Sequence, residues 1–409
     1  MKKIGILGLW HLGCVYSACL AEKGLDVTGY DADKAVVESL QKGKSPIFEP
    51  GLEDLIKKNL GKMLGFTNNR KDAISGKDYI IIAIDTPVDN KDKVQMKSIL
   101  DTFKLLKKFL SSKTTVVVSS QVPVGTCSTL QKKIKNLVLC LPENLRLGQA
   151  IEMFLNPDRI VLGGDKIARK KFLSDFSFFQ SPVLEMSLES AEMSKHALNS
   201  YLATMISFSS EISDFCESVG ADANDVVAAL KTDARVSPKA PLSPGLGFAG
   251  GTLGRDIQTL KYVGKRVNYN PKLAKAVYQV NKDRLPHLME KIKKTLGKLK
   301  DKRIGLLGLT YKPGTNTLRR SQSLELIRIL SKHGAQVTST DPAINKPNYK
   351  EFFKALDAIV LMTPWDEFRN LKPKEFGPLM KKKIVFDARN FLDKKLYERA
   401  GFKCVGVGI

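Results

Sequence analysis

The feature that most constrains the fold of this 409-residue chain is a short apolar run that leads directly into a glycine turn, and the chain contains it twice. Residues 3–7 form the first run and end at Gly8, and residues 303–307 form the second and end at Gly308. After each turn, further short apolar runs alternate with stretches of helical spacing. Strands that alternate with helices favour parallel sheets with helices on both faces. We therefore predict an α/β fold with two doubly wound parallel sheets.

Apolar runs predict the strands at both ends of the chain. The predicted amino-terminal strands are 3–7, 25–30, 79–84, 115–119, 137–141 and 160–162. The predicted carboxy-terminal strands are 303–307, which leads into the glycine turn at 308–309, then 336–339, 358–361 and 383–386. Between these two groups, apolar residues recur at helical spacing over residues 187–230 and again over 268–296. A Pro/Gly-rich stretch separates these helical parts at residues 237–254.

The chain is too long for a single ordinary hydrophobic core, so we predict three domains. Residues 1–185 are expected to form a dinucleotide-binding, Rossmann-like domain, and residues 298–409 a second Rossmann-like domain. Residues 186–297 are expected to form a central helical segment. Long helices with an exposed apolar face usually need a partner, so we expect this segment to mediate dimerisation. The chain is thus predicted to form a homodimer or a higher homo-oligomer.

The formal net charge is +24, from 66 Lys and Arg residues against 42 Asp and Glu residues. Such a charge would attract any anionic partner, including nucleic acid, a membrane surface or a phosphorylated metabolite. The lysines are spread along the whole chain, and the sequence contains no recognisable nucleic-acid-binding module. We interpret the charge as a solvated basic surface and expect neither a nucleic-acid partner nor a membrane partner.

Membrane spans, disulfides and metal sites are not expected either. No apolar run approaches the roughly 20 residues needed to cross a bilayer. The six cysteines are scattered without a CxxC pair, and the four histidines show no metal-ligand spacing. Reduced thiols and a cytoplasmic location are the default expectation for such a chain.

The first glycine turn, residues 8–13, approximates the GxGxxG fingerprint of dinucleotide-binding proteins, with Trp10 at the place of the second glycine. Phosphate could still rest on the amino-terminal amides of the following helix. Asp31 ends the second predicted strand, where a carboxylate would accept hydrogen bonds from an adenosine ribose and disfavour a 2′-phosphate. These features predict NAD rather than NADP as the cofactor. The cofactor contacts expected here are Gly8, Trp10, His11, Leu12, Gly13 and Asp31.

Several short sequence motifs, in a fixed order along the chain, resemble those of a known family. They occupy residues 48–52, 85–88, 120–126, 142–146, 156–161, 191–199, 245–251 and 308–313. On these motifs the chain resembles the UDP-glucose/GDP-mannose dehydrogenase family over essentially its whole length. The resemblance implies oxidation of a sugar C6 alcohol to a carboxylate by two hydride transfers to NAD. In the family this proceeds through an aldehyde and a cysteine-bound thiohemiacetal.

The resemblance also implies roles for individual residues. Positions that contact the cofactor fall on Thr86, Pro87, Ser120 and Arg319, and a carboxylate linked to water activation falls on Glu143. Lys195 and Asn199 match a pair that faces the reacting oxygen. Because residues i and i+4 share a helix face, an ammonium and an amide there can converge on one developing oxyanion. The alternative is that both are solvent-facing residues of a long helix.

The nucleotide-sugar substrate is assigned by the same resemblance, with UDP-glucose as the expected sugar nucleotide. Arginine suits phosphate recognition because its planar fork can donate two parallel hydrogen bonds. As an alternative, Arg389 could merely pair with a surface carboxylate. The implied substrate contacts are Glu143, Leu145, Lys195, Asn199, Arg235, Gly247, Phe248, Tyr311, Lys312 and Arg389.

The chain departs from the family pattern at the catalytic motif of residues 247–256. Thr252 stands where the family has its nucleophilic cysteine, whereas Asp256 is retained as a catalytic residue. An aliphatic hydroxyl supplies almost no alkoxide without a strong adjacent base, so the covalent second step is in question. Gln121 and Leu147 replace a usual threonine and a usual glutamate.

Three functions remain open at this point. The first is a nucleotide-sugar dehydrogenase that oxidises the hydrated aldehyde without a covalent intermediate, or stops after one oxidation. The second is a catalytically weakened homologue that binds nucleotide sugar and regulates or scaffolds polysaccharide biosynthesis. The third is a basic nucleic-acid-binding protein built on the same fold.

Overall fold

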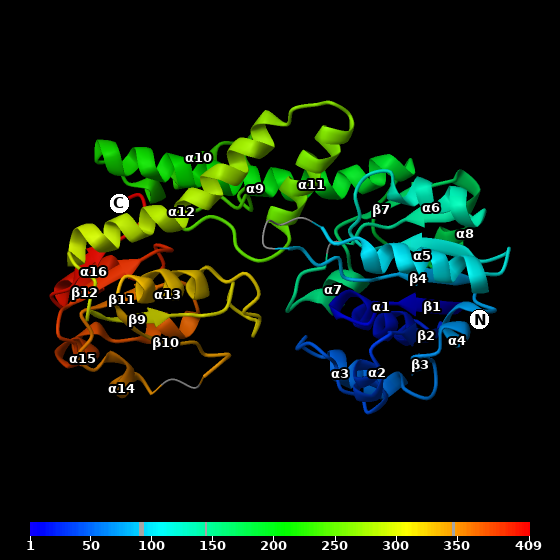
Figure 1. Cartoon of the computed structure of the whole chain (residues 1–409), viewed down its shortest axis with the longest axis horizontal. Coiled ribbons are helices and arrows are strands. Elements are labelled where there is room, and N and C mark those ends of the chain that lie inside the picture. The colour runs from blue at the N-terminus through cyan, green and yellow to red at the C-terminus, as the bar shows by residue number, and fades with distance from the viewer. Residues whose placement is uncertain (90–93, 144, 346–347) are drawn as a thin grey trace. The chain divides into compact units, whose positions relative to one another are not determined.

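The computed structural model describes residues 1–89, 94–143, 145–345 and 348–409 (Figure 1). The chain forms two units, Met1–Leu198 and Asn199–Ile409, and each has its own parallel-sheet core. The two α/β sheets confirm the predicted fold class.

The first unit contains a sheet of eight strands in the order β3-β2-β1-β4-β5-β6-β7-β8. The strands are β1 (Lys3–Leu7), β2 (Asp26–Tyr30), β3 (Leu64–Thr67), β4 (Tyr79–Ile82), β5 (Thr115–Val118), β6 (Val138–Cys140), β7 (Ile160–Gly164) and β8 (Val183–Met186). The reversal of strand order beside β1 places the carboxyl ends of β1 and β4 at a topological switch point, where ligands of such sheets bind.

Helices cover both faces of this sheet and create two apolar cores. One face packs against α1 (His11–Glu22), α2 (Lys34–Gln41), α3 (Leu52–Asn59), α7 (Ala150–Leu155) and α8 (Lys166–Asp175). The other packs against α4 (Arg70–Ile74), α5 (Lys97–Phe109), α6 (Thr126–Ile134) and the start of α9 (Leu188–Val219). Figure 1 shows α1 and α5 on opposite sides of β4. The β1 and β4 strands are buried on both faces, which explains why they read as continuous apolar runs.

The sheet differs from the predicted one in one pairing and two strands. β6 and β7 pair antiparallel, whereas the other pairs of this sheet are parallel. The connection between these two strands contains α7, which packs on α1, where Phe154 lies edge-to-face with Tyr16 at a ring-centroid distance of 4.8 Å. β8 was not predicted because its residues are half-buried or exposed, and β3 contains only two buried residues.

The helices after the first sheet are α9, α10 (Ala223–Thr232), α11 (Leu253–Arg266) and α12 (Lys272–Leu296). α9 begins in the first unit and ends in the second. The expected central helices are therefore present. α11 was not predicted because it starts inside the Pro/Gly-rich stretch and contains Gly254 and Gly264, which weaken the helical signal.

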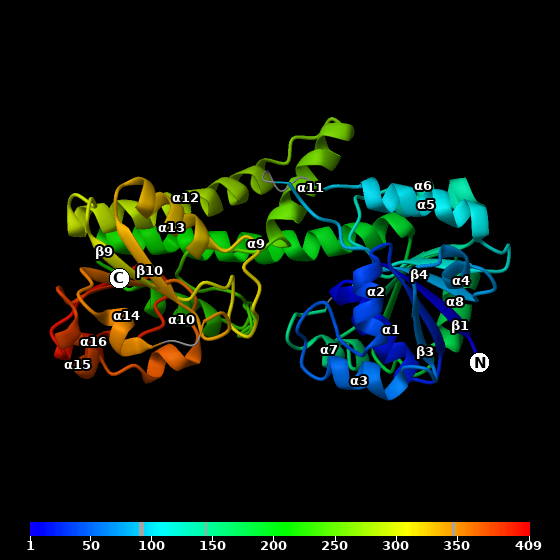
Figure 2. The ribbon, with the colours of Figure 1, turned by 60° about the horizontal axis from the view of Figure 1, so that its bottom comes forward.

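The second unit contains a parallel sheet in the order β10-β9-β11-β12-β13. Its strands are β9 (Arg303–Leu307), β10 (Gln336–Thr340), β11 (Ala358–Leu361), β12 (Ile384–Asp387) and β13 (Lys403–Val405). One face packs on α12 and α13 (Gln322–Lys332). The other packs on α14 (Tyr349–Phe353), α15 (Pro373–Phe376), α16 (Lys394–Arg399) and the 3-10 turn η1 (Asp366–Asn370), and a second 3-10 turn, η2 (Gly377–Leu379), follows α15. Figure 2 shows α13 and α14 on opposite sides of β10.

Within the described residues, the structure has no helix that is both long enough and apolar enough to cross a membrane.

Candidate functional site

The first glycine turn joins β1 tightly to α1. Gly8 has φ +96°, a conformation that L side chains rarely adopt, and a Cβ there would lie 2.8 Å from the Ile84 Cα. A Cβ on Gly13 would lie 1.7 Å from the Gly8 carbonyl oxygen. Both glycines are thus required by the close packing of the α1 amino terminus on the strand end. This is the backbone geometry that a dinucleotide fingerprint provides.

Trp10 occupies the turn without backbone strain. Its φ of −88° and ψ of −157° are extended values open to any residue, and its side chain is 45% exposed. The neighbouring His11 Nε2 lies 2.8 Å from Glu49 Oε2. Glu49 is buried and also accepts backbone N–H bonds from Gly148 and Ala150, each at 2.8 Å. His11 therefore ties the turn to the chain before α3 and α7, while Leu12 packs against the apolar core.

Asp31 lies directly after β2 and faces the same turn. Its Oδ2 accepts the Leu9 amide at 2.8 Å, and its Oδ1 accepts the Asp33 amide at 3.0 Å. The residue is only half-buried. A carboxylate can accept about four hydrogen bonds, so both oxygens retain capacity for the hydroxyls of a ribose.

The predicted cofactor residues Thr86 and Ser120 link the loops that follow β4 and β5. The Thr86 hydroxyl donates to the Gln121 carbonyl at 3.0 Å, and the Ser120 hydroxyl lies 2.8 Å from the Ile84 carbonyl oxygen. Both are buried, whereas Pro87 is exposed. These side chains hold the carboxyl edge of the sheet together, and their cofactor contacts stay predictions.

Glu143 and Lys195 line one pocket of the first unit, together with Ser120, Gln121 and Cys140. The Lys195 Nζ lies 3.9 Å from Glu143 Oε1, and the Glu143 Oε2 accepts the Leu145 amide at 2.5 Å. The Lys195 side chain is 10% exposed. The solvent-facing alternative for Lys195 is therefore wrong. Asn144 of the same motif lies outside the described residues.

Asn199 is one turn beyond Lys195 on α9 and is also buried. In the second unit its Nδ2 donates to Asp256 Oδ2 at 2.5 Å, and Asp256 has no exposed surface. Asp256 lies in the first turn of α11, and the exposed Thr252 immediately precedes that helix. The structure thus brings Asn199 and Asp256 together and leaves the Thr252 side chain accessible.

The glycine loop of residues 245–250 is fastened by an amide side chain from α12. Gly247 has φ +73°, and a Cβ there would lie 2.3 Å from the Asn281 Oδ1. Asn281 accepts the Phe248 amide at 2.7 Å and donates to the Phe248 carbonyl at 3.1 Å. Side chains of the protein itself therefore hold the loop in this conformation, which lowers the cost of ordering it when a ligand binds.

Arg389 holds the same loop from the carboxy-terminal sheet. Its guanidinium donates to the Gly247 carbonyl at 3.2 Å, to the Met362 carbonyl at 3.0 Å and to the Gln322 side-chain oxygen at 3.0 Å. Burial lowers the pKa of Arg389, and the Asp387 carboxylate opposes that shift. The alternative of a surface carboxylate as the partner of Arg389 is therefore wrong. Its contact with substrate stays a prediction.

The other predicted substrate residues of the second unit differ in exposure. Tyr311 contacts Gly250, where a Cβ would lie 3.0 Å from the ring, and burial raises the pKa of its phenol. The Lys312 Nζ lies 5.8 Å from the Tyr311 ring centroid, and Arg319 is exposed. The Arg235 side chain is 88% exposed and pairs with Asp233, whose pKa it lowers to about 2.

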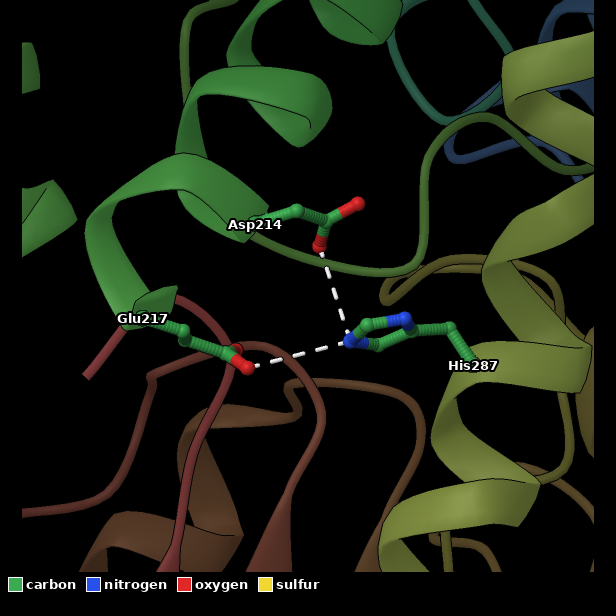
Figure 3. A group of neighbouring side chains, drawn as sticks. All are labelled: Asp214, Glu217 and His287. Carbon is green, nitrogen blue, oxygen red and sulfur yellow. Dashed lines mark ion pairs between the residues drawn. The ribbon is translucent and has the colours of Figure 1, made fainter. Parts of the chain in front are cut away.

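A separate cluster of the second unit has the composition of a metal site. Asp214 and Glu217 of α9 face His287 of α12 (Figure 3), and their ligand atoms lie within 4.8 Å of one another. Both carboxylates are already paired with cations, Asp214 with the buried Arg284 at 2.5 Å and Glu217 with Lys291. Two adjacent cations oppose a metal ion at this place. Glu217 also accepts the Gly408 amide at 2.5 Å, so the cluster fastens the carboxy terminus to α9.

Residues that hold the site in place were not predicted individually. Glu49, Glu192, His196, Asn281 and Gln322 all fix backbone around the predicted contacts. The first three lie inside the motifs that carry the family resemblance. Their burial depends on partners far away in the sequence, and spacing alone does not reveal those partners.

Comparison with known proteins gives a consistent family assignment along the chain. Residues 2–176 match the NAD binding domain of the UDP-glucose/GDP-mannose dehydrogenase family, residues 189–283 its central domain and residues 305–394 its UDP binding domain. The chain is 33% identical over 431 residues to UDP-glucose 6-dehydrogenase TuaD of Bacillus subtilis, covering 100% of this chain and 93% of that protein. It is 31% identical over 440 residues to a UDP-glucose 6-dehydrogenase of Rhizobium meliloti, with 99% of each covered.

Solved structures show the same architecture. A UDP-glucose dehydrogenase from Pyrobaculum islandicum superposes with a TM-score of 0.90 at 28% identity, covering 100% of this chain and 97% of that chain. A UDP-D-ManNAc dehydrogenase from Pyrococcus horikoshii superposes with a TM-score of 0.91 at 24% identity, covering 99% of each chain. The similarity to the Pyrococcus horikoshii structure supports the fold only, and not a function.

Proposed function

Because this chain belongs to the UDP-glucose/GDP-mannose dehydrogenase family, we propose that it oxidises the C6 hydroxyl of a UDP-sugar, with UDP-glucose as the substrate. The match of residues 2–176 to the family's NAD binding domain and of residues 305–394 to its UDP binding domain supports both ligands. The relatives at 33% and 31% identity are UDP-glucose 6-dehydrogenases, which supports glucose as the sugar.

The observation that carries this proposal is the position of Lys195, whose side chain is only 10% exposed, one helical turn before the buried Asn199 on α9. An ammonium and an amide that are shielded from water can stabilise a developing oxyanion far better than exposed groups can. Asp256 accepts a hydrogen bond from the Asn199 amide and thereby fixes its rotamer. Asn199 would then direct its remaining polar atoms at the sugar oxygen. Lys195 in its amine form would accept the C6 hydroxyl proton as the hydride leaves C6, and the ammonium so formed would stabilise that oxygen.

The residues of the first glycine turn fit the dinucleotide that this chemistry requires. NAD, when bound, supplies the acceptor for the hydride that leaves C6. Gly8 and Gly13 keep the turn close to the α1 amino terminus, and Asp31 presents a half-exposed carboxylate beside it. The backbone amides of the turn would hold the diphosphate, and Asp31 would hold the adenosine ribose.

Thr252 determines our proposal for the second oxidation. Its hydroxyl is exposed before α11, and Asp256 in the same helix turn is already engaged by Asn199. We propose that water, not Thr252, adds to the aldehyde. The resulting hydrate would lose a hydride from C6 to a second NAD and one hydroxyl proton to a base, which leaves the carboxylic acid. Glu143 is the candidate base, since its carboxylate lines the pocket with Lys195.

Counting NADH per sugar consumed tests this function. Purified protein is incubated with NAD and a panel of UDP-linked and GDP-linked sugars, and the products are separated by chromatography. Two NADH per UDP-glucose would support the complete oxidation without a cysteine, and one would support an aldehyde product. Thr252→Cys should raise the rate of the second oxidation only. The second candidate function is a regulator or scaffold, and the replacement of the family's cysteine by Thr252 also suggests it. That function would be favoured if the protein bound a nucleotide sugar tightly but produced no NADH with any sugar.

A homodimer through α9 belongs to the same proposal. Tyr201, Phe208 and Phe215 follow one another at intervals of seven residues, and their side chains are 62%, 47% and 63% exposed. Seven residues are about two helical turns, so the three rings form one apolar stripe along α9. Sedimentation velocity should give a dimer for the native chain, and Phe208→Glu should give a monomer. A native monomer at micromolar concentration would contradict the dimer.

The proposed compartment is the cytoplasm. All six cysteines lie in the described part of the chain, and none of them forms a disulfide. Fractionation of cells that express the protein would test this assignment.

A further inference from the structure

The helix α6 begins with a residue that cannot cap it. Gly125 is the N-cap, with φ +90°, and it has no side chain to accept the first amides of the helix. The carboxylate of Glu192, on α9, takes that place. It accepts the Gly125 amide at 2.6 Å and the Cys127 amide at 2.7 Å, one with each oxygen. A negative charge is favourable at this helix end, where unpaired amides and the helix dipole concentrate positive potential.

His196 makes a second link between α9 and the same loop. Its Nε2 lies 2.8 Å from the Val122 carbonyl oxygen, so the ring donates a hydrogen bond there. Glu192 and His196 are 3% and 1% exposed. They are four residues apart and therefore lie on one side of α9. The loop between β5 and α6 is thus held by α9 at its middle, through Val122, and at its carboxy-terminal end, through Gly125.

Lys195 lies in the same helix turn as these two contacts. The pocket that contains Lys195 and Glu143 is also lined by Glu192, His196 and Ser120. Both links therefore fix the position of Lys195 relative to the loop that carries Ser120 and Gln121. We propose that Glu192 and His196 are positioning residues, which hold the Lys195 ammonium at the place required for hydride transfer. This inference rests on the role proposed above for Lys195.

The energetics of Glu192 argue against a purely stabilising role. Burial raises the pKa of its carboxyl, and the hydrogen bonds from Cys127 and Gly125 oppose this rise without cancelling it. A raised pKa means that the folded state disfavours the charged form at neutral pH. Glu192→Gln removes that penalty but loses one of the two amide bonds. The melting temperature should therefore change by no more than about 3 °C.

Activity should respond much more strongly than stability. For Glu192→Gln, kcat with NAD and UDP-glucose should fall by about tenfold to a hundredfold, since a displacement of about 1 Å has such effects. The KM values should stay within about threefold, because substrate-contacting groups are unchanged. Glu189→Gln is the matched control. Glu189 lies one turn earlier on α9 and bonds to Ser128 of the same helix α6, but it is exposed. It should behave like the native protein.

Two further variants separate positioning from structure. In a Lys195→Ala background, Glu192→Gln should cause no further loss of kcat if Glu192 acts through Lys195. His196→Gln retains a donor for the Val122 carbonyl and should keep most activity, whereas His196→Leu should lose it. An additive loss in the double variant would overturn the proposal. So would a Glu192→Gln protein with a lowered melting temperature and a normal kcat per folded molecule.

A readout that needs no turnover distinguishes this inference from the proposed function. Mass spectrometry follows the rate at which an N-hydroxysuccinimide ester acetylates Lys195. The rate is measured in the native protein, in Glu192→Gln and in Glu189→Gln. Glu192→Gln should raise the rate several-fold, and Glu189→Gln should not. If the native protein makes no NADH but this difference is seen, only the proposed function fails. Equal acetylation rates in all three proteins would overturn the inference itself.

Discussion

The two glycine turns of this chain share their backbone but differ in what they can bind. Gly8 and Gly308 have φ values of +96° and +94°, and each ends the first strand of its sheet. In both turns the next residue donates its amide to an aspartate that follows the second strand. The distances are 2.8 Å to Asp31 and 2.7 Å to Asp341. The same local sequence pattern has therefore produced the same local structure twice.

The surroundings of the two aspartates set the turns apart. Asp31 is half-buried and accepts two backbone amides, whereas Asp341 is fully buried. Five donors surround Asp341, namely the backbone amides of Leu309, Thr310 and Ala343, the Thr310 hydroxyl and the Trp365 indole. An aspartate that is enclosed in this way has no access to a ribose. The second turn uses the carboxylate for structure, and the first leaves it accessible to a ligand.

The helices that follow the two turns also differ, because only α1 starts close to its turn. α1 begins at His11, three residues after Gly8, so its amino terminus lies at the turn. α13 begins only at Gln322, well beyond Gly308. A diphosphate needs the helix amides close to the turn. The comparison teaches that a glycine turn alone does not mark a dinucleotide site, since the access of the aspartate and the start of the helix decide it.

The largest expected effect follows from Gly13, which has no counterpart in the second turn. Gly13→Ala would place a methyl 1.7 Å from the Gly8 oxygen and must displace α1. We expect loss of about 4 kcal/mol or more of unfolding free energy and loss of NAD binding. Thermal denaturation and calorimetric titration with NAD would measure both. Gly65→Ala, at an open position in β3, is the control and should change neither. Normal NAD binding by Gly13→Ala would contradict the assigned geometry of the turn.

Replacing Asp341 should mainly lower the stability of the protein, whereas replacing Asp31 should mainly lower its affinity for NAD. Asp341→Ala leaves buried donors without an acceptor and should cost about 3–5 kcal/mol of unfolding free energy, with NAD affinity unchanged in the folded fraction. Asp31→Ala should cost only about 1 kcal/mol of stability. It should weaken NAD binding by about tenfold or more, because it removes a charged acceptor for the ribose. Urea denaturation and NAD titration of both variants would check this. If Asp341→Ala weakened NAD binding instead, the roles assigned to the turns would be reversed.

The sequence predicted the fold best where strands are buried on both faces. The predicted bounds of β1 and β11 agree with the structure to the residue, because four consecutive residues of each strand are buried and a turn or polar residue lies at one end. The half-exposed β8 and the glycine-containing α11 were missed, since neither shows a clear apolar period. The antiparallel pairing of β6 with β7 joins two strands that are separated along the chain, and no local sequence pattern encodes it.

For the site, the sequence indicated the residues but not their surroundings. Low exposure of Lys195 and Asn199 could be expected from the family motif. Asn199 is in fact buried, and the Lys195 side chain is 10% exposed. The bonds of Arg389 to the glycine loop and of Glu192 to α6 could not be expected. Each joins groups more than 60 residues apart in the chain, so only the folded structure reveals them.

A smaller effect is expected from restoring the missing glycine of the first turn. The exposed Trp10 carries a Cβ and an indole where a dinucleotide fingerprint leaves room for the diphosphate. Trp10→Gly should therefore strengthen NAD binding by roughly threefold to tenfold, a change of about 1 kcal/mol. Thr310→Gly, at the corresponding place of the second turn, should leave NAD affinity unchanged and lower stability, because the Thr310 hydroxyl bonds to Asp341. Weaker NAD binding by Trp10→Gly would show that the indole contributes to cofactor binding.

The smallest signal is optical, and it reports on the two turns separately. The chain has two tryptophans, and one lies at each turn, Trp10 exposed at the first and Trp365 bonded to Asp341 at the second. NAD that binds beside Trp10 should quench its emission by tens of per cent and leave that of Trp365 nearly constant. Titrations of Trp365→Phe and Trp10→Phe would isolate the two signals. Because each indole senses only its own surroundings, quenching of Trp365 alone would place the dinucleotide at the second turn and reverse the comparison.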